Sequence, residues 1–568
     1  MNTKSFKTRI RIVALCVFFF ACILVLKLFS LGIVHQNKYA ERADKQYATP
    51  TGDMFDRGNI FFTKKDGSLL AGGNIMTGYK IAIKAKDIQD PEYLYTILQP
   101  YTKLNHDEFI KKATNINDPY EEVASRLTKE NADAISELRI KGVTIYKEKW
   151  RFYPGDSLAS HAVGFVAFKG DERVGQYGLE KFYNKTLMKP KEDAYVNFFA
   201  EVFSNIGKTF SNTKEGDIVT TIEPTVQATL ESEMNATFQK WNADQIGAII
   251  MDPNTGEIYG MSAYPSFDLN NFGSVEDPKT YANPLVESVF EFGSVIKPLV
   301  VAAALDQGVI TPDTTYLDKG SIVVNKKTIN NFDKKARGVA SMQTVLDQSL
   351  NTGMVFIENK MGHDSFRKYM KNYSMGDKTG IDLPNETSGL VKNLDSKIDL
   401  DYANMSFGQG LAITPIGAIR AFSSIANGGT LVTPHIVNEV KYNDGTSSKL
   451  SFPPAKTGIL KKESTDTATR MLVHVFDSYG NGSYKLENYS VATKTGTAQV
   501  ALETGKGYYD DRHTHSFFGY FPAYKPRFIV FLFIKNQRGA RYASETLIPP
   551  FVNITKFLLN YYNIPPDR

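Results

Sequence analysis

The stretch that decides the fold is Glu291-Phe-Gly-Ser-Val-Ile-Lys-Pro-Leu-Val-Val-Ala-Ala-Ala-Leu305. Its apolar, alanine-rich part predicts a buried helix that ends near Gly308, and Pro298 is tolerated only in the first turn of that helix. Ser294 then lies at the helix N-terminus, where free backbone N–H groups and the helix dipole favour negative charge. Lys297 lies on the same face one turn along, where burial would lower its pKa and let it take the serine proton. Ser294 and Lys297 are therefore a candidate nucleophile and base.

Two further motifs follow in the order S-x-x-K, S-x-N and K-T-G, which together describe a serine acyl-transfer site. A loop at Ser349-Leu-Asn351 would aim Ser349 as a proton relay and Asn351 as a partner for a substrate amide.

Lys494-Thr-Gly-Thr497 lies in a sequence that predicts a strand, and Gly496 allows close approach of a substrate backbone. The Lys494 cation and the hydroxyls of Thr495 and Thr497 suit a C-terminal carboxylate. The N–H groups of Thr497 and Ser294 could form an oxyanion hole.

Other copies of these motifs have the wrong context. Ser211–Lys214 lies in a polar turn, and Ser365–Lys368 lies in a charged helix after the S-x-N motif. Lys378–Gly380 runs into a turn, and Lys456–Gly458 follows two prolines. We therefore expect the site to use Ser294 and Lys494.

Residues 12–34 form an apolar run of 23 residues, which at about 1.5 Å per residue crosses a hydrocarbon core of roughly 30 Å. Lys4, Lys7, Arg9 and Arg11 precede it, so the positive-inside rule places residues 1–11 in the cytoplasm and the body outside. A cleaved signal peptide is the alternative, but no small-x-small site follows the run. We expect a single-pass anchor in the inner (plasma) membrane with a periplasmic, extracytoplasmic body.

The composition sets limits on the rest of the chain. At 568 residues it can form two or three domains, and a net charge of +5 gives no nucleic-acid footprint. Both cysteines, Cys16 and Cys22, lie in the apolar run, so the body has no disulfide or cysteine-based metal site. His513-Thr-His515 would share one face of a strand, but no third metal ligand is apparent.

The pattern of strands and helices predicts an α+β protein. Residues 35–213 mix short β-like stretches with loops and one helical piece at 121–139, and we interpret them as a non-catalytic pedestal. Residues 214–568 contain two hairpins and the Lys494 strand, which together predict a five-stranded, largely antiparallel sheet. A last helix would cover this sheet with Phe551, Ile554, Leu558 and Tyr561.

With these residues in place, nearly the whole chain resembles a class B penicillin-binding protein, a monofunctional peptidoglycan D,D-transpeptidase of division or elongation. Its signatures are Arg57-Gly-Asn-Ile60, Asp66-Gly67, Arg151-Phe-Tyr-Pro154, His161-x-x-Gly164, Gly175-x-x-Gly178-x-Glu180, Asp252-Pro-Asn-Thr-Gly256, Thr379-Gly-Ile-Asp-Leu-Pro384, Ser406-Phe-Gly-Gln-Gly410 and Thr414-Pro415. Phe292 departs from the family, which commonly has proline there; we expect it to change only how the chain enters the helix.

The resemblance implies that Ser294 is acylated by D-Ala-D-Ala stem peptides and by β-lactams, without metal or organic cofactor. It assigns the base to Lys297, relay and orientation to Ser349 and Asn351, and carboxylate and oxyanion binding to Lys494, Thr495 and Thr497. Because no glycosyltransferase domain precedes the pedestal, a separate membrane glycosyltransferase is the implied partner. A D,D-carboxypeptidase or β-lactamase shares these residues, and a non-enzymatic β-lactam sensor or divisome scaffold is a further alternative.

Overall fold

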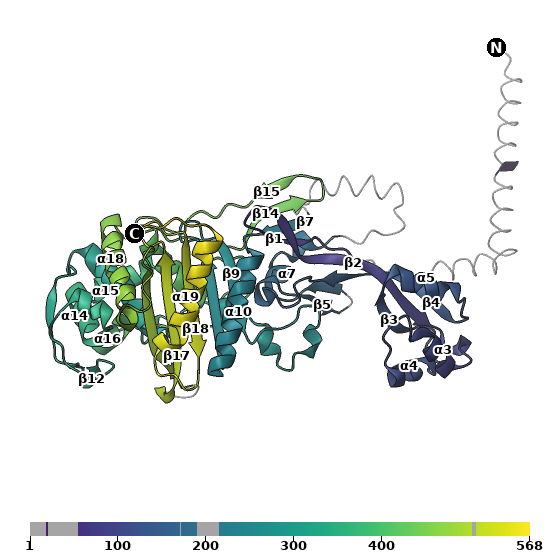
Figure 1. The fold of residues 1–568 in the computed structure, drawn as a ribbon, viewed down its shortest axis with the longest axis horizontal. Helices are drawn as coiled ribbons and strands as arrows, with labels where there is room; N and C mark the ends of the chain where they lie inside the picture. Colours follow the sequence, from purple (N-terminus) through teal and green to yellow (C-terminus); the bar gives the residue numbers. More distant parts are fainter. Residues whose placement is uncertain (1–18, 21–54, 171, 190–214, 503–506) are drawn as a thin grey trace, which may run out of the picture. The chain divides into compact units, whose positions relative to one another are not determined.

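The computed structural model describes residues 19–20, 55–170, 172–189, 215–502 and 507–568 (Figure 1). Its described part divides into two compact units. The smaller comprises Met76–Trp150, and the larger comprises residues 56–75, 151–189 and those from 215 onward. The predicted domain boundary at residues 213 and 214 lies outside the described residues and stays a prediction.

The smaller unit packs helices against the second half of a long strand, β2 (Leu69–Ile83). Strands β3 (Glu121–Leu127) and β4 (Val143–Phe152) pair with β2. Its helices are α3 (Pro91–Leu98), α4 (His106–Ala113) and α5 (Lys129–Glu137). Buried side chains such as Ile81, Leu98, Phe109 and Ile135 form one apolar core. This unit is α+β in itself.

The helix predicted over residues 121–139 is wrong in its first half. Glu121–Leu127 is strand β3, whose residues pair antiparallel with Tyr79–Ile83 of β2. The helix begins only after Thr128, whose side chain accepts a hydrogen bond from the Asn131 N–H as a helix cap. Pairing with a strand 40 residues earlier overrides the local helix preference of the glutamates.

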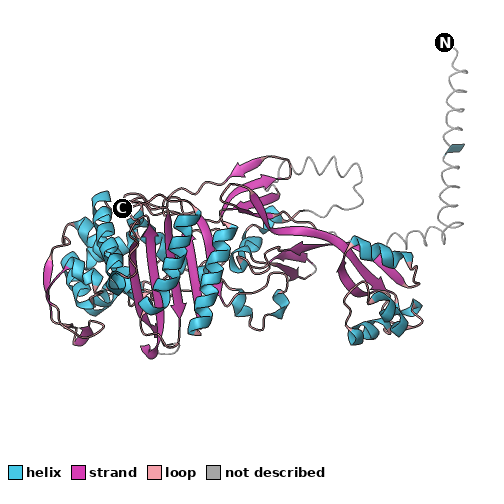
Figure 2. Cartoon of the chain, viewed as in Figure 1, coloured by secondary structure: helices cyan, strands magenta, loops and turns pink. Residues whose placement is uncertain are grey.

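A five-stranded antiparallel sheet in the order β16-β17-β18-β8-β9 organises the larger unit, as predicted. The strands are β8 (Gln245–Met251), β9 (Ile258–Tyr264), β16 (Ala492–Ala501), β17 (Tyr508–Phe521) and β18 (Phe528–Lys535). Figure 2 shows these strands between helices. Strand β16, with the K-T-G motif, is the edge strand.

Helices cover both faces of this sheet, so its strands bury alternate side chains on opposite sides. Phe531 of β18 faces the cluster that includes α17 (Pro415–Ala426), while Leu532 faces the cluster of α10 (Pro224–Trp241) and α19 (Ala543–Tyr561). Figure 1 shows α10 and α19 over one face. Phe551, Ile554 and Leu558 of α19 are buried there, and Tyr561 is partly buried, as the periodicity predicted.

A second sheet contains β1 (Ile60–Thr63), β7 (Gly216–Thr220), β14 (Val437–Tyr442) and β15 (Ser447–Lys449). Strand β7 pairs in parallel with β1 and antiparallel with β14. Segments far apart in the sequence therefore share one sheet within the larger unit.

The remaining elements complete the larger unit. The strands are β5 (Val166–Lys169), β6 (Glu172–Gly175), β10 (Thr315–Asp318), β11 (Ser321–Val324), β12 (Lys327–Asn330) and β13 (Gly338–Ser341). The helices are α6 (Ser160–Val163), α7 (Gly178–Phe182), α8 (Asn184–Leu187), α11 (Pro284–Glu287), α12 (Lys297–Gln307), α13 (Met342–Asp347), α14 (Asn351–Met361), α15 (His363–Asn372), α16 (Asp399–Ser406) and α18 (Lys462–Ser478).

Glu180 joins three of the N-terminal signatures through a buried ion cluster. Its carboxylate accepts from Arg57 Nε at 2.5 Å and from Arg151 Nε at 2.6 Å, and its carbonyl accepts from Arg57 Nη2. Tyr153 OH donates to the same carboxylate. Burial raises the pKa of Glu180, but the two guanidinium groups outweigh it and hold the pKa below its ordinary value. These signature residues therefore have a structural role, because they tie three segments of the larger unit together.

No helix within the described residues is long and apolar enough to cross a bilayer. The predicted anchor at residues 12–34 lies outside them, except for Phe19 and Phe20.

Candidate active site

Ser294 lies where a short 3-10 turn, η6 (Gly293–Ile296), runs directly into α12. The sequence predicted this helix, and its C-terminal cap is Gly308 in the left-handed conformation. Gly293 has φ +63°, and a Cβ there would lie 2.9 Å from the Thr497 carbonyl oxygen. The residue before Ser294 therefore has to be glycine, because any side chain would meet the neighbouring strand.

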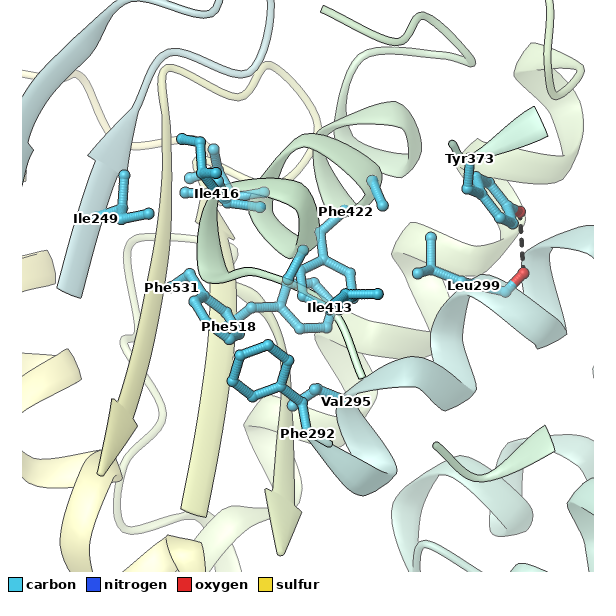
Figure 3. Close-up of a cluster of buried hydrophobic side chains, with 14 of the residues drawn as sticks. Ile249, Phe292, Val295, Leu299, Tyr373, Ile413, Ile416, Phe422, Phe518 and Phe531 are labelled. Atoms are coloured by element: carbon cyan, nitrogen blue, oxygen red, sulfur yellow. Dashed lines mark hydrogen bonds between the residues drawn. The ribbon is translucent and has the colours of Figure 1, made fainter. Parts of the chain in front are cut away.

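Apolar side chains on either side of Ser294 fix it to the sheet (Figure 3). Phe292 and Val295 are fully buried, and the Phe292 ring meets the Phe531 ring edge-on at 4.9 Å. The Phe292 carbonyl accepts a hydrogen bond of 2.7 Å from Ser516 Oγ. Phe292, the departure from the family pattern, thus holds the entry to the helix against β17 and β18.

Lys297 is fully buried and bridges to the S-x-N loop. Its Nζ donates to the Ser349 carbonyl oxygen at 2.7 Å and to Asn351 Oδ1 at 2.8 Å. Ser349 Oγ lies 3.1 Å from the same nitrogen. These three partners match the three N–H donors of a charged lysine, and they also match the two N–H donors and one lone pair of a neutral lysine if the Ser349 hydroxyl donates. The arrangement therefore accommodates Lys297 both with and without its charge.

The S-x-N loop is held in an uncommon backbone conformation between α13 and α14. Ser349 has φ +52°, which is rare for a residue with a side chain and is often found at functional sites. Asn351 begins α14, and its Nδ2 donates to the Asn330 carbonyl oxygen at 2.9 Å. Before this loop, Gly338–Ser341 forms strand β13, and the Ser341 side chain caps α13.

Edge strand β16 brings Lys494, Thr495, Gly496 and Thr497 beside the turn that contains Ser294. A Cβ on Gly496 would lie 2.4 Å from the Phe292 carbonyl oxygen, so this strand and η6 are in direct backbone contact. The Thr497 carbonyl faces Gly293, and in an antiparallel ladder the N–H of one residue points to the same edge as its C=O. The Thr497 N–H therefore points toward the turn that carries Ser294.

Neighbouring groups position the hydroxyls of the K-T-G strand. Tyr479 OH accepts from the Thr495 N–H at 3.1 Å and lies 3.5 Å from Thr495 Oγ1. Thr497 Oγ1 accepts from the Ala543 N–H at 3.2 Å. Sequence reasoning missed Tyr479 because it precedes the motif by 15 residues in a turn without any pattern of its own.

Two buried lysines control the electrostatics of the site. Burial, and secondly the charge on Lys494, hold the pKa of Lys297 well below its ordinary value. Burial also lowers the pKa of Lys494 to about 7, against the opposing attraction of Asp347. Because a charge on Lys494 disfavours a second one nearby, Lys297 is the first of the two to lose its proton.

An aromatic contact joins the segment after Asn331 to the segment before Ala543, and the sequence did not reveal it. The Phe332 and Tyr542 rings meet edge-on with centroids 6.0 Å apart. Phe332 follows Asn331, which accepts from the Thr352 N–H, and Tyr542 precedes Ala543, which donates to Thr497. Only the folded chain brings these two segments, 210 residues apart, together.

The competing motif copies serve other purposes. Ser365 Oγ accepts from Gln307, and Thr379 donates through N and Oγ1 to Glu386. Lys456 donates to Lys371 O and Ser374 Oγ at 2.9 Å each. Ser211–Lys214 lies outside the described residues. None of the described copies lies at a lysine buried like Lys297.

The two histidines of β17 are part of the sheet. His515 is buried between Thr546 Oγ1 at 2.9 Å and Gln537 Nε2 at 2.7 Å, and burial lowers its pKa to about 3. In the part of the chain that the structure describes, no group of three or more His, Cys, Asp or Glu side chains could hold a metal ion.

Comparison with known proteins matches both parts of the chain to domains of penicillin-binding proteins. Residues 246–554 match the penicillin binding protein transpeptidase domain, and residues 55–201 match the penicillin-binding protein dimerisation domain. The chain is 32% identical over 450 residues to stage V sporulation protein D of Bacillus subtilis, which covers 78% of this chain and 69% of that protein. It is 28% identical over 454 residues to the peptidoglycan D,D-transpeptidase FtsI of Escherichia coli K12, covering 78% and 73%.

A solved structure agrees with the fold. The apo form of penicillin binding protein 3 from Mycobacterium tuberculosis superimposes with a TM-score of 0.65 at 26% identity, covering 74% of this chain and 92% of that one. The same protein complexed with aztreonam gives 0.66. The chain therefore belongs to the class B penicillin-binding proteins and combines their dimerisation and transpeptidase domains.

Proposed function

We propose that this chain is a serine D,D-transpeptidase that cross-links peptidoglycan stem peptides through an acyl-enzyme on Ser294. The observation that carries the proposal is the fully buried Lys297, one turn from Ser294 and hydrogen-bonded to both members of the S-x-N motif. A lysine kept neutral by burial can act as a general base.

In the first step, Ser294 Oγ attacks the carbonyl carbon between the two terminal D-alanines. Lys297 takes the serine proton, and Ser349 relays a proton to the amine of the leaving D-Ala. The C–N bond breaks, and an ester on Ser294 remains. Asn351 orients the substrate amide while it holds Lys297 in place.

The K-T-G strand binds the end of the donor peptide. Lys494 and the Thr495 and Thr497 hydroxyls recognise the terminal carboxylate, and Gly496 lets the peptide backbone approach. The N–H groups of Ser294 and Thr497 stabilise the oxyanion; support comes from the orientation of Thr497 toward the nucleophile turn. β-Lactams enter the same site as acylating substrate mimics.

In the second step, an amine of a neighbouring stem peptide attacks the ester and releases Ser294. Water in place of the amine would give a D,D-carboxypeptidase or β-lactamase, which share these catalytic groups. A silent sensor or scaffold has no need of a buried, desolvated base, so the state of Lys297 favours an enzyme over these alternatives.

We further propose that residues 12–34 anchor the chain in the plasma membrane with the catalytic part outside. The apolar run and its basic N-terminal flank support this orientation. The chain would work with a membrane glycosyltransferase that polymerises the glycan strands, in division or in elongation.

The test is an assay of the purified full chain with a pentapeptide donor ending in D-Ala-D-Ala and a stem-peptide amine acceptor. We expect D-Ala release and a cross-linked product from the wild type and from Ser365→Ala, which alters a competing motif copy. Ser294→Ala should give neither product. Cross-linking by Ser294→Ala would reject the assignment, and D-Ala release without any cross-link would favour the hydrolase.

A further inference from the structure

Residues 318–337, which run from the end of β10 to just before β13, concentrate positive charge. They include six basic and two acidic residues, a net charge of +4, whereas the whole chain of 568 residues has +5. Five of the basic residues are exposed lysines, which we call the basic surface: Lys319, Lys326, Lys327, Lys334 and Lys335. Within the part of the chain that the structure describes, none of their ammonium groups has an ion pair or a hydrogen bond. These cations are free to bind a ligand.

The basic surface is built on the hairpin of β11 and β12, which is held at both ends. In the turn, Asn325 Oδ1 accepts a hydrogen bond of 2.9 Å from the Leu400 N–H. At the open end, the Asn331 N–H donates to the Gly320 carbonyl oxygen at 3.0 Å. Figure 1 shows the hairpin, labelled at β12, against α14 and α16. The lysines therefore project from a backbone with a fixed position.

The lysines form two sets that are separated along the hairpin. The turn carries Lys326 and Lys327, and the open end carries Lys319, Lys334 and Lys335. The open-end set is close together, because a Cβ on Gly320 would lie 2.8 Å from the Lys334 carbonyl oxygen. Four strand residues separate the two sets, a span of about 13 Å. Since charges are screened over about 8 Å at physiological salt, one small anion cannot neutralise both sets, but an extended ligand with repeated negative charges can.

Two of the lysines have backbone conformations that favour other residues. Lys326 has φ +64° and Lys334 has φ +59°. This left-handed region is uncommon for residues with a side chain, and two-residue hairpin turns usually have glycine at the second position, where this chain has Lys326. Lysine at both positions carries a local conformational cost, which indicates that the side chains are used.

The acidic residues near the basic surface have other partners. Asp333 forms an ion pair of 2.7 Å with Arg337, the remaining basic residue of the segment. Near the turn, the two carboxylates that flank Leu400 also have contacts of their own: Asp399 with His363, and Asp401 with Ser396. The positive charge of the five lysines is therefore not paired within this part of the structure.

Hydrogen bonds join the open end of the hairpin to the S-x-N motif. The carbonyl oxygen of Asn330, the last residue of β12, accepts from Asn351 Nδ2 at 2.9 Å. Asp318, buried at the end of β10, accepts from Asn331 Nδ2 at 3.0 Å and from Thr352 Oγ1 at 2.8 Å. The basic surface is thus attached to the segment that contains Asn351, to which the proposed function gives the substrate amide.

We propose that the basic surface binds uncross-linked peptidoglycan strands outside the acyl site, through the carboxylates of stem peptides that are not reacting. The inference rests on the proposed transpeptidase function and adds a second contact with the polymer, which needs no reach to Ser294. A stem peptide that ends in D-Ala-D-Ala has a terminal carboxylate, so a strand of such units repeats negative charge along its length. Contact at two places raises the affinity for the polymer above that for one free peptide.

The test measures the affinity of the full chain for fluorescently labelled, soluble glycan strands that carry pentapeptide stems. Ser294→Ala serves as the parent, so that no ester forms during the measurement. The alanine variant adds Lys319→Ala, Lys326→Ala, Lys327→Ala, Lys334→Ala and Lys335→Ala. We expect it to bind the strands at least roughly tenfold more weakly, the effect of losing several exposed ion pairs. Both proteins should bind amidated strands, and a single free pentapeptide, with equal affinity.

Two matched variants complete the design. Arginine at the same five positions keeps the charge and should bind strands like the parent. A second variant loses the same charge from exposed lysines scattered elsewhere, and should also bind like the parent: Lys279→Ala, Lys378→Ala, Lys485→Ala, Lys525→Ala and Lys556→Ala. With Ser294 restored, the alanine variant of the basic surface should be labelled by penicillin at the wild-type rate, which checks that it folds.

The outcomes separate this proposal from the proposed function. Equal strand affinity of the parent and the alanine variant would overturn the basic surface as a strand site. An equal loss with amidated strands, or in the variant with scattered substitutions, would also overturn it, because recognition of carboxylates by these five lysines would then not be the cause. Strand binding that depends on the five lysines, in a chain whose wild type forms no cross-linked product, would reject the transpeptidase and support the surface.

Discussion

Lys297 Nζ lies 2.8 Å from Asn351 Oδ1, which links the S-x-x-K motif to the S-x-N motif in one hydrogen bond. The Lys297 side chain is fully buried, and burial lowers its pKa. The charge of a second buried lysine, Lys494, lowers the pKa further. The site thus obtains a neutral amine from burial and from a second cation, without any carboxylate partner in the described hydrogen bonds of Lys297. The predictions below follow from this pair and from the packing that holds it.

Replacing the base should abolish acylation without unfolding the chain. For Lys297→Ala we expect the rate constant for acylation by penicillin to fall about 10²- to 10⁴-fold, the usual effect of losing a general base. Stopped-flow labelling measures the rate, and thermal unfolding checks that the variant still folds although Ser349 O and Asn351 Oδ1 lose their buried donor. Lys368→Ala, in the competing copy, is the control. Equal acylation in both variants would contradict the role of Lys297.

The two lysines predict opposite effects of pH. Lys297 is neutral above its lowered pKa, so the acylation rate should fall as the pH falls and Lys297 takes up a proton. Lys494 is charged below a pKa of about 7 and neutral above it, so binding of a carboxylate donor should weaken as the pH rises through 7. A profile of kcat/KM against pH, which reports the free enzyme, measures both. A donor peptide amidated at its C-terminus should lose the alkaline limb; if that limb persists, Lys494 does not bind the carboxylate.

Gly496 is predicted to be irreplaceable because of backbone contact. In Gly496→Ala the new Cβ would lie 2.4 Å from both the Phe292 carbonyl oxygen and Ser516 Oγ, so β16 must move away from the nucleophile turn. We expect stability to fall by about 1–3 kcal/mol and acylation to fall by about 10²-fold. Gly273→Ala, with nothing within 4 Å of its Cβ, is the matched control. Denaturation and penicillin labelling check the two effects, and a fully active Gly496→Ala would refute the close contact.

The Glu180 cluster should control the stability of the larger unit. Glu180→Gln leaves the Arg57 and Arg151 cations buried without a carboxylate, and breaking a buried pair in this way costs about 3–5 kcal/mol. Chemical denaturation followed by circular dichroism measures the loss. Asp364→Asn, which breaks an exposed pair with Arg367, should leave the transition midpoint unchanged. Equal midpoints for the two variants would show that the cluster does not stabilise the fold.

Local signals in the sequence were enough to predict much of this molecule. The sheet, the helix behind Ser294 and the edge strand with Lys494 have their own periodicity or end signals, and the structure has them where predicted. The strand Glu121–Leu127 was missed because pairing with β2 decides its conformation.

Contacts between distant segments could not be predicted from the sequence either, because they too depend on which segments the fold brings together. Glu180 lies 123 residues from Arg57, and nothing local shows that the two are paired. Lys392 and Lys535 belong to no motif, and only the folded chain brings them to the lining of one cavity. The sequence could thus indicate which residues react but not what holds or surrounds them.

The central claim is that Ser294 carries the acyl group, and mapping a penicillin adduct by mass spectrometry tests it most directly. After brief exposure of the full chain to penicillin, digestion should place the added mass of the intact antibiotic on the peptide that contains Ser294. Ser294→Ala should carry no adduct, whereas Ser365→Ala should be labelled like the wild type. An adduct retained in Ser294→Ala, or found on a peptide containing Ser211 or Ser365, would contradict the account.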